Sequence, residues 1–206
     1  MGRRSTHTPE ELRELILQAT QDIIERDGLA GLSARAIARR IDYSPGTLYN
    51  VFQNLDDLVL HVEANVLDTL EKRLGLVGHG DSPMEAVQKL ASAYLEFTRE
   101  RPRLWNLLFE HHLPSKVQIP EWYQAKLDGL LQRVEQAIAP LFQRDDAAGL
   151  RRSARVLWAG VHGIASLSTS DKLSTITSES AQVLVDELVA SYVSGLAVQQ
   201  RRMVNC

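Results

Sequence analysis

The sequence predicts an all-α fold of about nine helices. Apolar residues recur at helical spacing along almost the whole chain, while alternating runs of β-branched residues bounded by turn dipeptides are nearly absent. Capping residues and prolines precede the apolar segments, and glycines or prolines follow them. These observations favour a helical protein with short connections.

Length and composition are those of a packed protein without covalent staples. The chain has 206 residues, 44% of them hydrophobic, which is enough for a sizeable core. Its one cysteine, Cys206, allows no disulfide framework and no multi-cysteine zinc site, as is typical of a reducing cytosol. The first residues carry Arg3 and Arg4 without an apolar segment behind them, and no later run approaches the roughly 18 uninterrupted apolar residues of a membrane span. We therefore expect a soluble cytoplasmic protein with no membrane partner, metal or cofactor.

Charge is distributed unevenly. The net charge of −3 argues against a protein that coats nucleic acid indiscriminately. Three basic residues, Arg35, Arg39 and Arg40, nevertheless fall within six positions that contain no acidic residue. They indicate either a nucleic-acid contact or an ordinary solvated helix face.

The first three predicted helices lie within about fifty residues. Thr8 to Glu11 form a capping box that opens a first helix, which Gly28 closes. Ser33 caps a second helix of about eight residues. After the tight connection at Asp42 and Tyr43, Ser44 and Pro45 start a third helix that we expect to continue to about Val51 or Phe52, with Leu48 and Phe52 pointing inward. Two short helices braced by a longer one form the DNA-binding helix-turn-helix, although similar helix pairs occur in proteins that never touch DNA.

The remaining helices form the body of the protein. Asn54 caps a long helix that ends at the glycines from Gly75 onward. Ser82 to Glu85 form a second capping box. The predicted later helices begin at about 83 and 102, and then span about 120–138, 146–169 and 178–201.

The third helix offers polar groups suited to DNA. Thr47, Tyr49 and Asn50 are expected to point outward, where they can bond phosphates, contact a thymine methyl group or pair with adenine.

Two segments resemble a known family signature. Gly31 to Ala38 (GLSARAIA) and Tyr43 to Phe52 (YSPGTLYNVF) are similar, in order and spacing, to the signature of the TetR/AcrR family, and the similarity extends over residues 9–58. The resemblance implies a helix-turn-helix DNA-binding domain over 1–54, followed by a helical domain over 55–206 that binds an effector and dimerises through its last two helices. The implied partners are a double-stranded DNA operator, a small molecule and a second copy of the chain.

The resemblance also implies residue roles. Thr47 and Tyr49 would contact bases or backbone, and Ser33, Arg35 and Ser44 would hold phosphates. The full predicted DNA-binding set is Ser33, Arg35, Ser44, Pro45, Gly46, Thr47, Tyr49, Asn50 and Asn54.

The sequence departs from the family pattern at two of its positions. Asn50 replaces the usual His, and Leu55 replaces a Lys that would add a phosphate contact. The Asn54 side chain and the first amides of the next helix would partly compensate for that lysine, while Asp56 and Asp57 would oppose a phosphate there.

A weaker resemblance lies near the C-terminus. Trp158 to Leu167 (WAGVHGIASL) is similar to the Trp-His-Gly subgroup of TetR body domains. Trp158 and His162 share a helix face, and Gly160 and Gly163 permit close approach of another helix. Core packing is the plainer explanation, and the two are compatible. The predicted dimer interface is Trp158, His162, Leu184, Leu188, Tyr192 and Leu196.

Aromatic residues between positions 105 and 123 are candidates for an effector pocket. The predicted ligand-binding set is Trp105, Leu108, Phe109, His112, Trp122, Tyr123, Trp158 and His162. An apolar pocket is the default expectation, although each of these side chains would serve equally well in an ordinary core. The sequence does not indicate which molecule binds.

Two other functions are compatible with parts of the sequence. An enzyme could be built on Glu110, His111 and His112, with His162, but adjacent helical histidines diverge by about 100° and no HExxH, phosphate-binding loop or GxSxG motif accompanies them. The second is a DNA-binding or interaction protein without a ligand. The long predicted helices and the aromatic cluster of this chain, however, exceed what dimerisation alone requires. The sequence thus predicts a non-enzymatic, ligand-responsive regulator, a repressor that an effector releases from a near-palindromic operator.

Overall fold

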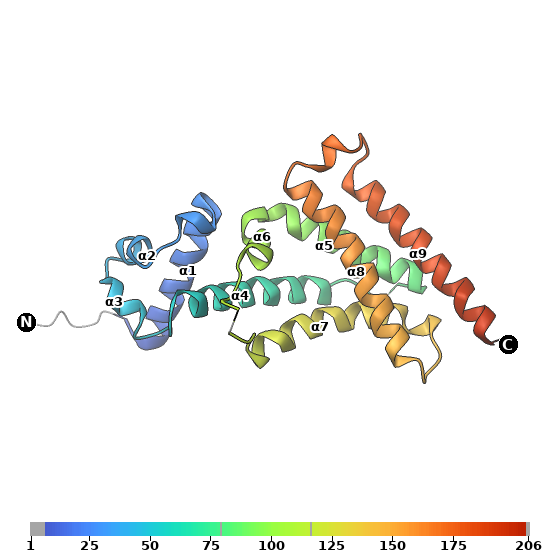
Figure 1. Cartoon of the computed structure of the whole chain (residues 1–206), viewed down its shortest axis with the longest axis horizontal. Coiled ribbons are helices and arrows are strands. Elements are labelled where there is room, and N and C mark those ends of the chain that lie inside the picture. Colours follow the sequence, from blue (N-terminus) through green and yellow to red (C-terminus); the bar gives the residue numbers. More distant parts are fainter. Residues whose placement is uncertain (1–6, 79, 116, 205–206) are drawn as a thin grey trace, which may run out of the picture. The chain divides into compact units, whose positions relative to one another are not determined.

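The computed structural model describes residues 7–78, 80–115 and 117–204, and within these ranges the chain is helical and contains no strand. The prediction of an all-α fold is confirmed. The nine α-helices of the described part are α1 Pro9–Asp27, α2 Ala34–Ile41, α3 Pro45–Leu48, α4 Leu55–Gly75, α5 Pro83–Glu100, α6 Pro102–Glu110, α7 Glu121–Ile138, α8 Ala147–Thr169 and α9 Ala181–Val204 (Figure 1). Short 3-10 turns occupy Leu29–Gly31, Ala139–Leu141 and Leu173–Thr175.

The chain divides into two compact units. The first contains the residues up to Leu67 together with Arg101–Tyr123, and the second contains Asp68–Glu100 and the residues from Gln124 onward. Helix α4 contributes to both, and α6 belongs to the first unit. The boundary between residues 54 and 55 divides the chain by expected function and stays a prediction.

In the first unit, α1 begins and ends as its sequence predicts. The Glu11 carboxylate accepts a hydrogen bond from the Thr8 amide at 2.7 Å, and the Thr8 hydroxyl accepts one from the Glu11 amide at 3.2 Å. Gly28 ends the helix at φ 74°, a conformation that strains residues with a side chain. Between these ends, the buried Ile16 and Ile23 face the core.

Helix α6 is attached to the C-terminal end of α1. The Arg103 guanidinium donates to the backbone carbonyl of Glu25 at 3.1 Å and also to that of Arg26. Arg101 lies 3.5 Å from the Glu25 carboxylate. The last carbonyls of a helix lack intrahelical partners and carry partial negative charge, so a cation stabilises this end and fixes α6 on α1.

In the second unit, α5 packs against both α8 and α9. Apolar side chains from the three helices, including Leu95, Leu157 and Val185, are fully or almost fully buried. Gly160 allows close packing between α8 and α9, because a Cβ at this position would lie 2.8 Å from a methyl group of Leu188. Gly163 faces open space instead, so only the first of the two glycines serves this contact.

Helix α7 is joined to the second half of α4 by ion pairs. Arg133 binds both carboxylate oxygens of Glu71 through Nε, at 2.9 and 3.0 Å, and Lys126 pairs with Asp68. The Glu71 hydrogen bonds raise the pKa of Arg133, which stays charged at any ordinary pH.

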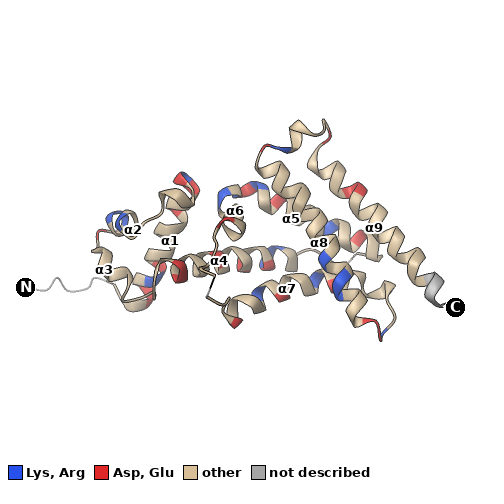
Figure 2. Ribbon diagram, viewed as in Figure 1, with Lys and Arg blue, Asp and Glu red and all other residues tan. Residues whose placement is uncertain are grey.

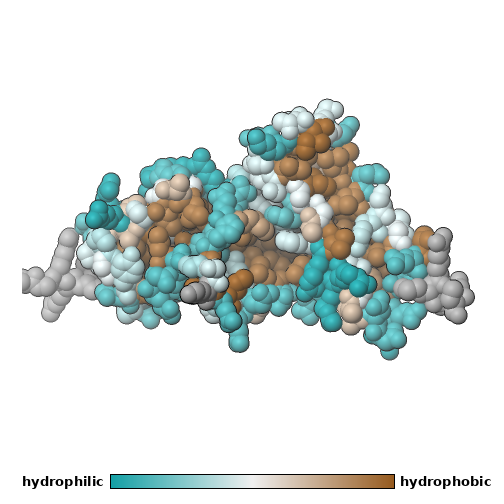
Figure 3. All heavy atoms as spheres, viewed as in Figure 1, coloured by the Kyte–Doolittle hydropathy of each residue, from teal (hydrophilic) through white to brown (hydrophobic). Residues whose placement is uncertain are grey.

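Helix α9 is long and apolar. Residues Ala181–Gln200 have a mean hydropathy of 1.3, so by length and composition this segment could cross a membrane. Only 28% of that window is buried, and its buried side packs against α5 and α8. Its remaining apolar surface joins that of α8, and apolar residues gather over these helices in Figure 3.

Candidate DNA-binding surface and effector region

A capped helix and a left-handed residue form the turn between α2 and α3. The Ser33 hydroxyl accepts a hydrogen bond from the Ala36 amide at 3.2 Å, confirming its position as the cap of α2. Asp42 ends the helix at φ 57° and ψ 43°, and the Tyr43 amide donates to the Ala38 carbonyl at 3.0 Å. The chain can therefore reverse within three residues and start α3 at Pro45.

Helix α3 is shorter than predicted, because it ends at Leu48 rather than near Val51 or Phe52. Beyond it, tighter i to i−3 hydrogen bonds continue: Asn50 donates to Thr47 at 3.2 Å and Val51 donates to Leu48 at 3.1 Å. Leu48 and Phe52 are buried, as predicted. The prediction of an α-helix reaching Val51 or Phe52 was wrong, but the prediction that Leu48 and Phe52 point inward is confirmed.

The opposite side of this segment is exposed. Tyr49 is 54% exposed, and Ser44, Pro45, Gly46 and Asn50 are exposed as well. Thr47 is half-buried, and its hydroxyl lies 3.0 Å from that of Ser44. These positions form one polar surface with a projecting aromatic ring.

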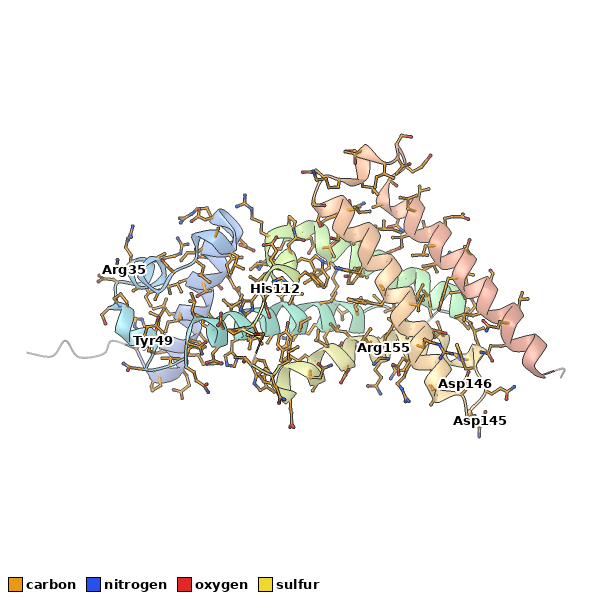
Figure 4. The ribbon with its side chains drawn as sticks, in the orientation of Figure 1. Arg35, Tyr49, His112, Asp145, Asp146 and Arg155 are labelled. Atoms are coloured by element: carbon orange, nitrogen blue, oxygen red, sulfur yellow. The ribbon has the colours of Figure 1, made fainter. Side chains whose placement is uncertain are left out.

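Two arginines of α2 are available to a ligand. Arg35 and Arg39 are exposed and make no ion pair with any described residue, and Figure 4 labels Arg35 on α2 and Tyr49 in the segment that follows α3. Arg40 instead pairs with Asp22 at 2.5 Å, and this hydrogen bond lowers the pKa of Asp22. The structure thus separates the basic cluster into two free cations and one structural ion pair. Arg3 and Arg4 lie outside the described residues.

The start of α4 is capped by side chains of its own segment. The Asn54 side chain accepts a hydrogen bond from the Asp57 amide at 2.8 Å, which confirms the predicted cap. The Asp57 carboxylate accepts one from the Gln53 amide at 2.9 Å. Leu55 is half-buried beside them. A phosphate at this helix end would compete with the Asp57 carboxylate.

Aromatic rings connect the helix-turn-helix to the first turn of α7. Arg13 lies 4.7 Å from the centre of the Phe52 ring, which packs against His61. His61 stacks on Trp122 at 4.8 Å with an interplanar angle of 6°. Burial lowers the pKa of His61, so it is held as a neutral ring in this stack.

A buried charge cluster lies deeper in the same unit. Glu63 of α4 is 2% exposed, and its carboxylate accepts a hydrogen bond from Nδ1 of His111 at 2.9 Å. Nε2 of His111 lies 3.3 Å from the carboxylate of Asp56, one of the residues in the first turn of α4. Tyr123 also hydrogen-bonds Glu63. One imidazole thus bridges two carboxylates of α4 and holds the end of α6 against it.

The cluster shifts the acid–base properties of its members. The hydrogen bond to Glu63 raises the pKa of His111, with burial opposing and Asp56 assisting. Burial and the Glu63 carboxylate raise the pKa of Tyr123 well above its usual value, so its hydroxyl stays protonated and donates. Sequence reasoning treated His111 only as part of a rejected enzyme site, because its partners lie 48 and 55 positions away in the sequence.

The raised pKa of His111 predicts a pH-dependent stability. Because His111 binds its proton more tightly in the folded protein, protonation of His111 stabilises the fold. This stabilisation is complete at pH values below the pKa of histidine in the unfolded chain, about 6.5, and it is lost as the pH rises through the higher pKa of the folded state. His61 and His162 shift in the opposite direction, so whole-protein melting mixes these effects. We therefore expect the difference in Tm between wild type and His111→Gln to be largest near pH 6 and to shrink toward pH 9. A difference that grows with pH would contradict the charged His111.

The predicted effector residues fall into both compact units. In the first, Trp105 and Tyr123 are buried, Leu108 is half-buried, and Phe109, His112 and Trp122 are exposed. Figure 4 marks His112 after the end of α6.

In the second unit, Trp158 and His162 are half-buried and stack on each other at 5.1 Å. The Tyr94 hydroxyl lies 2.9 Å from Nδ1 of His162. Burial lowers the pKa of His162, which favours a neutral ring that accepts this bond.

None of the predicted interface residues on α9 is among its exposed residues. Leu196 is buried, and Leu184, Leu188 and Tyr192 are half-buried. The most exposed apolar side chains lie instead at Val156 (51%), Val183 (49%) and Val198 (51%), with Leu167 at 36%. Sequence periodicity alone did not reveal these positions, because α8 and α9 are apolar on several sides.

The geometry of the first unit defines a helix-turn-helix protein with an additional helical body. Residues 16–62 match the bacterial regulatory proteins of the tetR family, and residues 87–192 match the tetracyclin repressor-like C-terminal domain. The second match covers more than half of the chain. The chain belongs to the TetR family of transcriptional regulators, with a DNA-binding domain followed by a ligand-binding domain.

Relatives and solved structures agree with this assignment. The chain is 26% identical over 182 residues to an HTH-type transcriptional regulator of Mycobacterium tuberculosis, covering 85% of this chain and 79% of the relative. It is 29% identical over 100 residues to the HTH-type transcriptional repressor KstR of Rhodococcus jostii, covering 48% and 47%.

Two solved structures share the fold. The TetR regulator SCO7222 of Streptomyces coelicolor has a TM-score of 0.69 at 17% identity, covering 90% of this chain and 97% of the other. The repressor FadR of Thermus thermophilus, in complex with lauroyl-CoA, has a TM-score of 0.64 at 19% identity, covering 89% and 94%.

Proposed function

We propose that the protein is a homodimeric repressor that binds a near-palindromic operator and leaves it when a small, mostly apolar effector binds. The observation that carries the DNA-binding part is the exposed surface of α2 and the α3 segment, which presents the Tyr49 ring together with Arg35 and Arg39, two exposed arginines without an ion pair to a described residue. Repression is supported by the relative KstR, which is named a repressor. The protein acts in the cytoplasm and is not an enzyme.

Each group of this surface has a distinct role. Thr47, Tyr49 and Asn50 enter the major groove, and Pro45 and Gly46 bring the backbone close to it. Arg35, Ser33 and Ser44 hold phosphates on one side, and the Asn54 amide group holds one at the start of α4. Arg39, which shares the exposure and free charge of Arg35, adds a further phosphate contact.

Dimerisation accounts for the exposed apolar surface of α8 and α9. Val156, Leu167, Val183 and Val198 would be covered by a second copy, with the half-buried Leu184, Leu188 and Tyr192 at the edge of the contact. Trp158 and His162, which are half-buried on α8, take part in the same contact. A two-fold dimer presents two recognition helices to successive major grooves about 34–36 Å apart.

The aromatic residues between Trp105 and Tyr123 contact an apolar part of the effector. The bound lauroyl-CoA of FadR shows that a protein of this fold takes an acyl ligand. In this chain the aromatic segment belongs to the same compact unit as the helix-turn-helix. Arg103 links it to α1, and His111 links it to α4, so an effector that displaces α6 would also displace the DNA-binding helices.

Restoring the family lysine at position 55 is expected to strengthen operator binding. Leu55→Lys adds one cation near a phosphate in each subunit, so affinity should rise several-fold and the slope of log K against log salt should steepen by about one per half-site, or about two for the dimer. Fluorescence anisotropy across a salt series measures both quantities. An unchanged slope would mean that the start of α4 does not approach the DNA backbone.

A two-stage experiment tests the proposed function. A thermal-shift screen of the purified protein against acyl-CoAs, fatty acids and sterols identifies an effector by concentration-dependent stabilisation. The hit is then added to a complex of the protein with an operator fragment. Release of the fragment at the concentrations that stabilise the protein is the expected result. Stabilisation without release would contradict the proposal that the effector releases the repressor from its operator. The absence of any stabilising compound would favour a DNA-binding protein without a ligand.

A further inference from the structure

Helix α8 and the Ala181–Gln200 part of helix α9 carry opposite charges, while the last turn of α9 adds Arg201 and Arg202. Helix α8 contains Arg151, Arg152 and Arg155 and no acidic residue. From Ala181 to Gln200, α9 contains Asp186 and Glu187 and no basic residue. Figure 2 shows the blue segment in the N-terminal part of α8 and the red segment in the N-terminal half of α9.

The key charges are not neutralised within the described chain. Arg151 and Arg152 are exposed and make no ion pair with a described residue, whereas Arg155 reaches Glu135 of α7 at 3.2 Å. Glu187 is exposed and accepts only a hydrogen bond from the Ser191 hydroxyl at 3.3 Å. Arg152 and Glu187 are therefore available to a partner.

Both charges lie on exposed helix faces that also carry valines. On α8, Arg152, Val156, Ala159 and Gly163 follow one another at helical spacing, and all four are exposed. The three arginines, Val156 and Ala159 line a shallow concavity, and Figure 4 marks Arg155 at this part of α8. On α9, the exposed positions up to Gln200 are Val183, Glu187, Ser191, Ser194, Gly195, Val198 and Gln199.

The fold of one chain keeps the two charges apart. The two helices run in opposite directions from the loop that joins them (Figure 1), and Gly160 meets Leu188 where they touch. Arg152 lies two turns before Gly160, about 12 Å along the axis, whereas Glu187 is adjacent to Leu188. The arginines and the acidic residues thus occupy different levels of the α8–α9 pair.

The direction of a two-fold axis decides whether these charges meet. An axis parallel to the helices keeps every residue at its own level, so Arg152 would face the C-terminal part of the partner's α9. An axis perpendicular to the helices reverses the levels, so the arginine end of one pair lies over the acidic end of the other. Attraction between oppositely charged patches favours the axis perpendicular to the helices. Because the contact is symmetric, it then contains the same arginine-to-glutamate pairing twice.

We propose that Arg152, assisted by Arg151, forms an ion pair across the dimer axis with Glu187 of a second copy, so that the α8–α9 pairs of the two subunits run in opposite directions. This inference rests on the proposed homodimer. It adds the relative direction of the helices in the two subunits and the charged residues by which one copy recognises another. Apolar contact supplies the buried area, and the two symmetric ion pairs select the arrangement and exclude partners without matching charges.

Charge reversal of the full-length protein tests the proposal. In Arg152→Glu and in Glu187→Arg, each homodimer carries two repulsive pairs, so the dimer Kd from sedimentation equilibrium should rise about tenfold to a hundredfold. Mixing the two variants should restore dimers, because both pairs in the heterodimer are attractive. The double variant Arg152→Glu with Glu187→Arg should also recover. Arg99→Glu, an exposed arginine of α5, is the control of equal charge change and should leave the Kd unaltered.

Each outcome separates the two proposals. Weak homodimers with a stable mixed dimer support the ion pair. Wild-type dimers that neither variant weakens, or that mixing does not restore, overturn the pairing and leave the repressor dimer in place. A wild type that is monomeric at micromolar concentration overturns both the pairing and the homodimer.

Discussion

Replacing His111 with alanine is expected to lower the free energy of unfolding by about 3 kcal/mol. The substitution removes the cation that neutralises Glu63, whose side chain is almost completely buried, and it also frees Asp56. Breaking a buried ion pair by removing one partner is costly because the remaining charge has no solvent to stabilise it. Denaturant unfolding at pH 6.5, followed by circular dichroism, measures the loss.

Two further variants separate charge from packing. Glu63→Gln keeps the shape and a hydrogen-bonding group while removing the buried charge, so its cost should be smaller than that of His111→Ala. In the double variant, the effects of the single changes should not add, since both residues belong to one pair. Additive losses, or a loss below about 1 kcal/mol for His111→Ala, would show that the carboxylate and the imidazole do not depend on each other.

Replacing Tyr49 and Arg35 with alanine together is expected to weaken operator binding by about a hundredfold or more. Tyr49 is the most exposed aromatic side chain of the α3 segment, and Arg35 is a free cation of α2. A base-edge or phosphate contact contributes about 1–3 kcal/mol, and two such contacts at each half-site of a dimer act together. Anisotropy titration of a labelled operator at fixed salt gives the change in Kd.

The same double variant should leave the fold intact. Neither side chain is part of the core, so Tm should stay within a degree or two of wild type. The variant Arg99→Ala, at an exposed arginine of α5, controls for the loss of one surface charge. Unaltered operator affinity in the double variant would place the DNA contact elsewhere on the chain.

Helix boundaries were the most predictable part of the fold, because each depends on a local chemical rule. Thr8 and Glu11 form their capping box, Gly28 takes the left-handed conformation that ends α1, and Asn54 caps α4. Pro83 and Pro102 begin α5 and α6. The side chain that satisfies the helix end lies within a few positions of it, so sequence spacing contains the necessary information.

The extent of α3 was not predictable by the same rules. A capped start and helical periodicity to Phe52 favoured a longer helix, but the hydrogen bonds tighten after Leu48. The cap of the next helix at Asn54 leaves little chain to complete another turn. Competition between two neighbouring helix starts depends on their packing, which a one-dimensional pattern does not contain.

Long-range polar pairs were the least predictable part of the site. Glu63 lies between apolar residues of α4, and nothing nearby in the sequence explains a buried carboxylate there. Its partner His111 comes from the end of α6. Likewise, the sequence does not distinguish Arg40 from Arg35 and Arg39, whereas in the structure Asp22 of α1 neutralises Arg40. Only the three-dimensional arrangement assigns these charges to structure or to ligand.

Footprinting of genomic fragments selected by the purified protein tests the central claim most directly. The account predicts protection of a near-palindrome whose two half-sites are centred one helical turn apart, about 34–36 Å, and loss of that protection in the variant lacking Tyr49 and Arg35. Protection of a single unpaired half-site would contradict the dimeric arrangement. If no sequence is protected even at low salt, the protein is not an operator-binding regulator of the proposed kind.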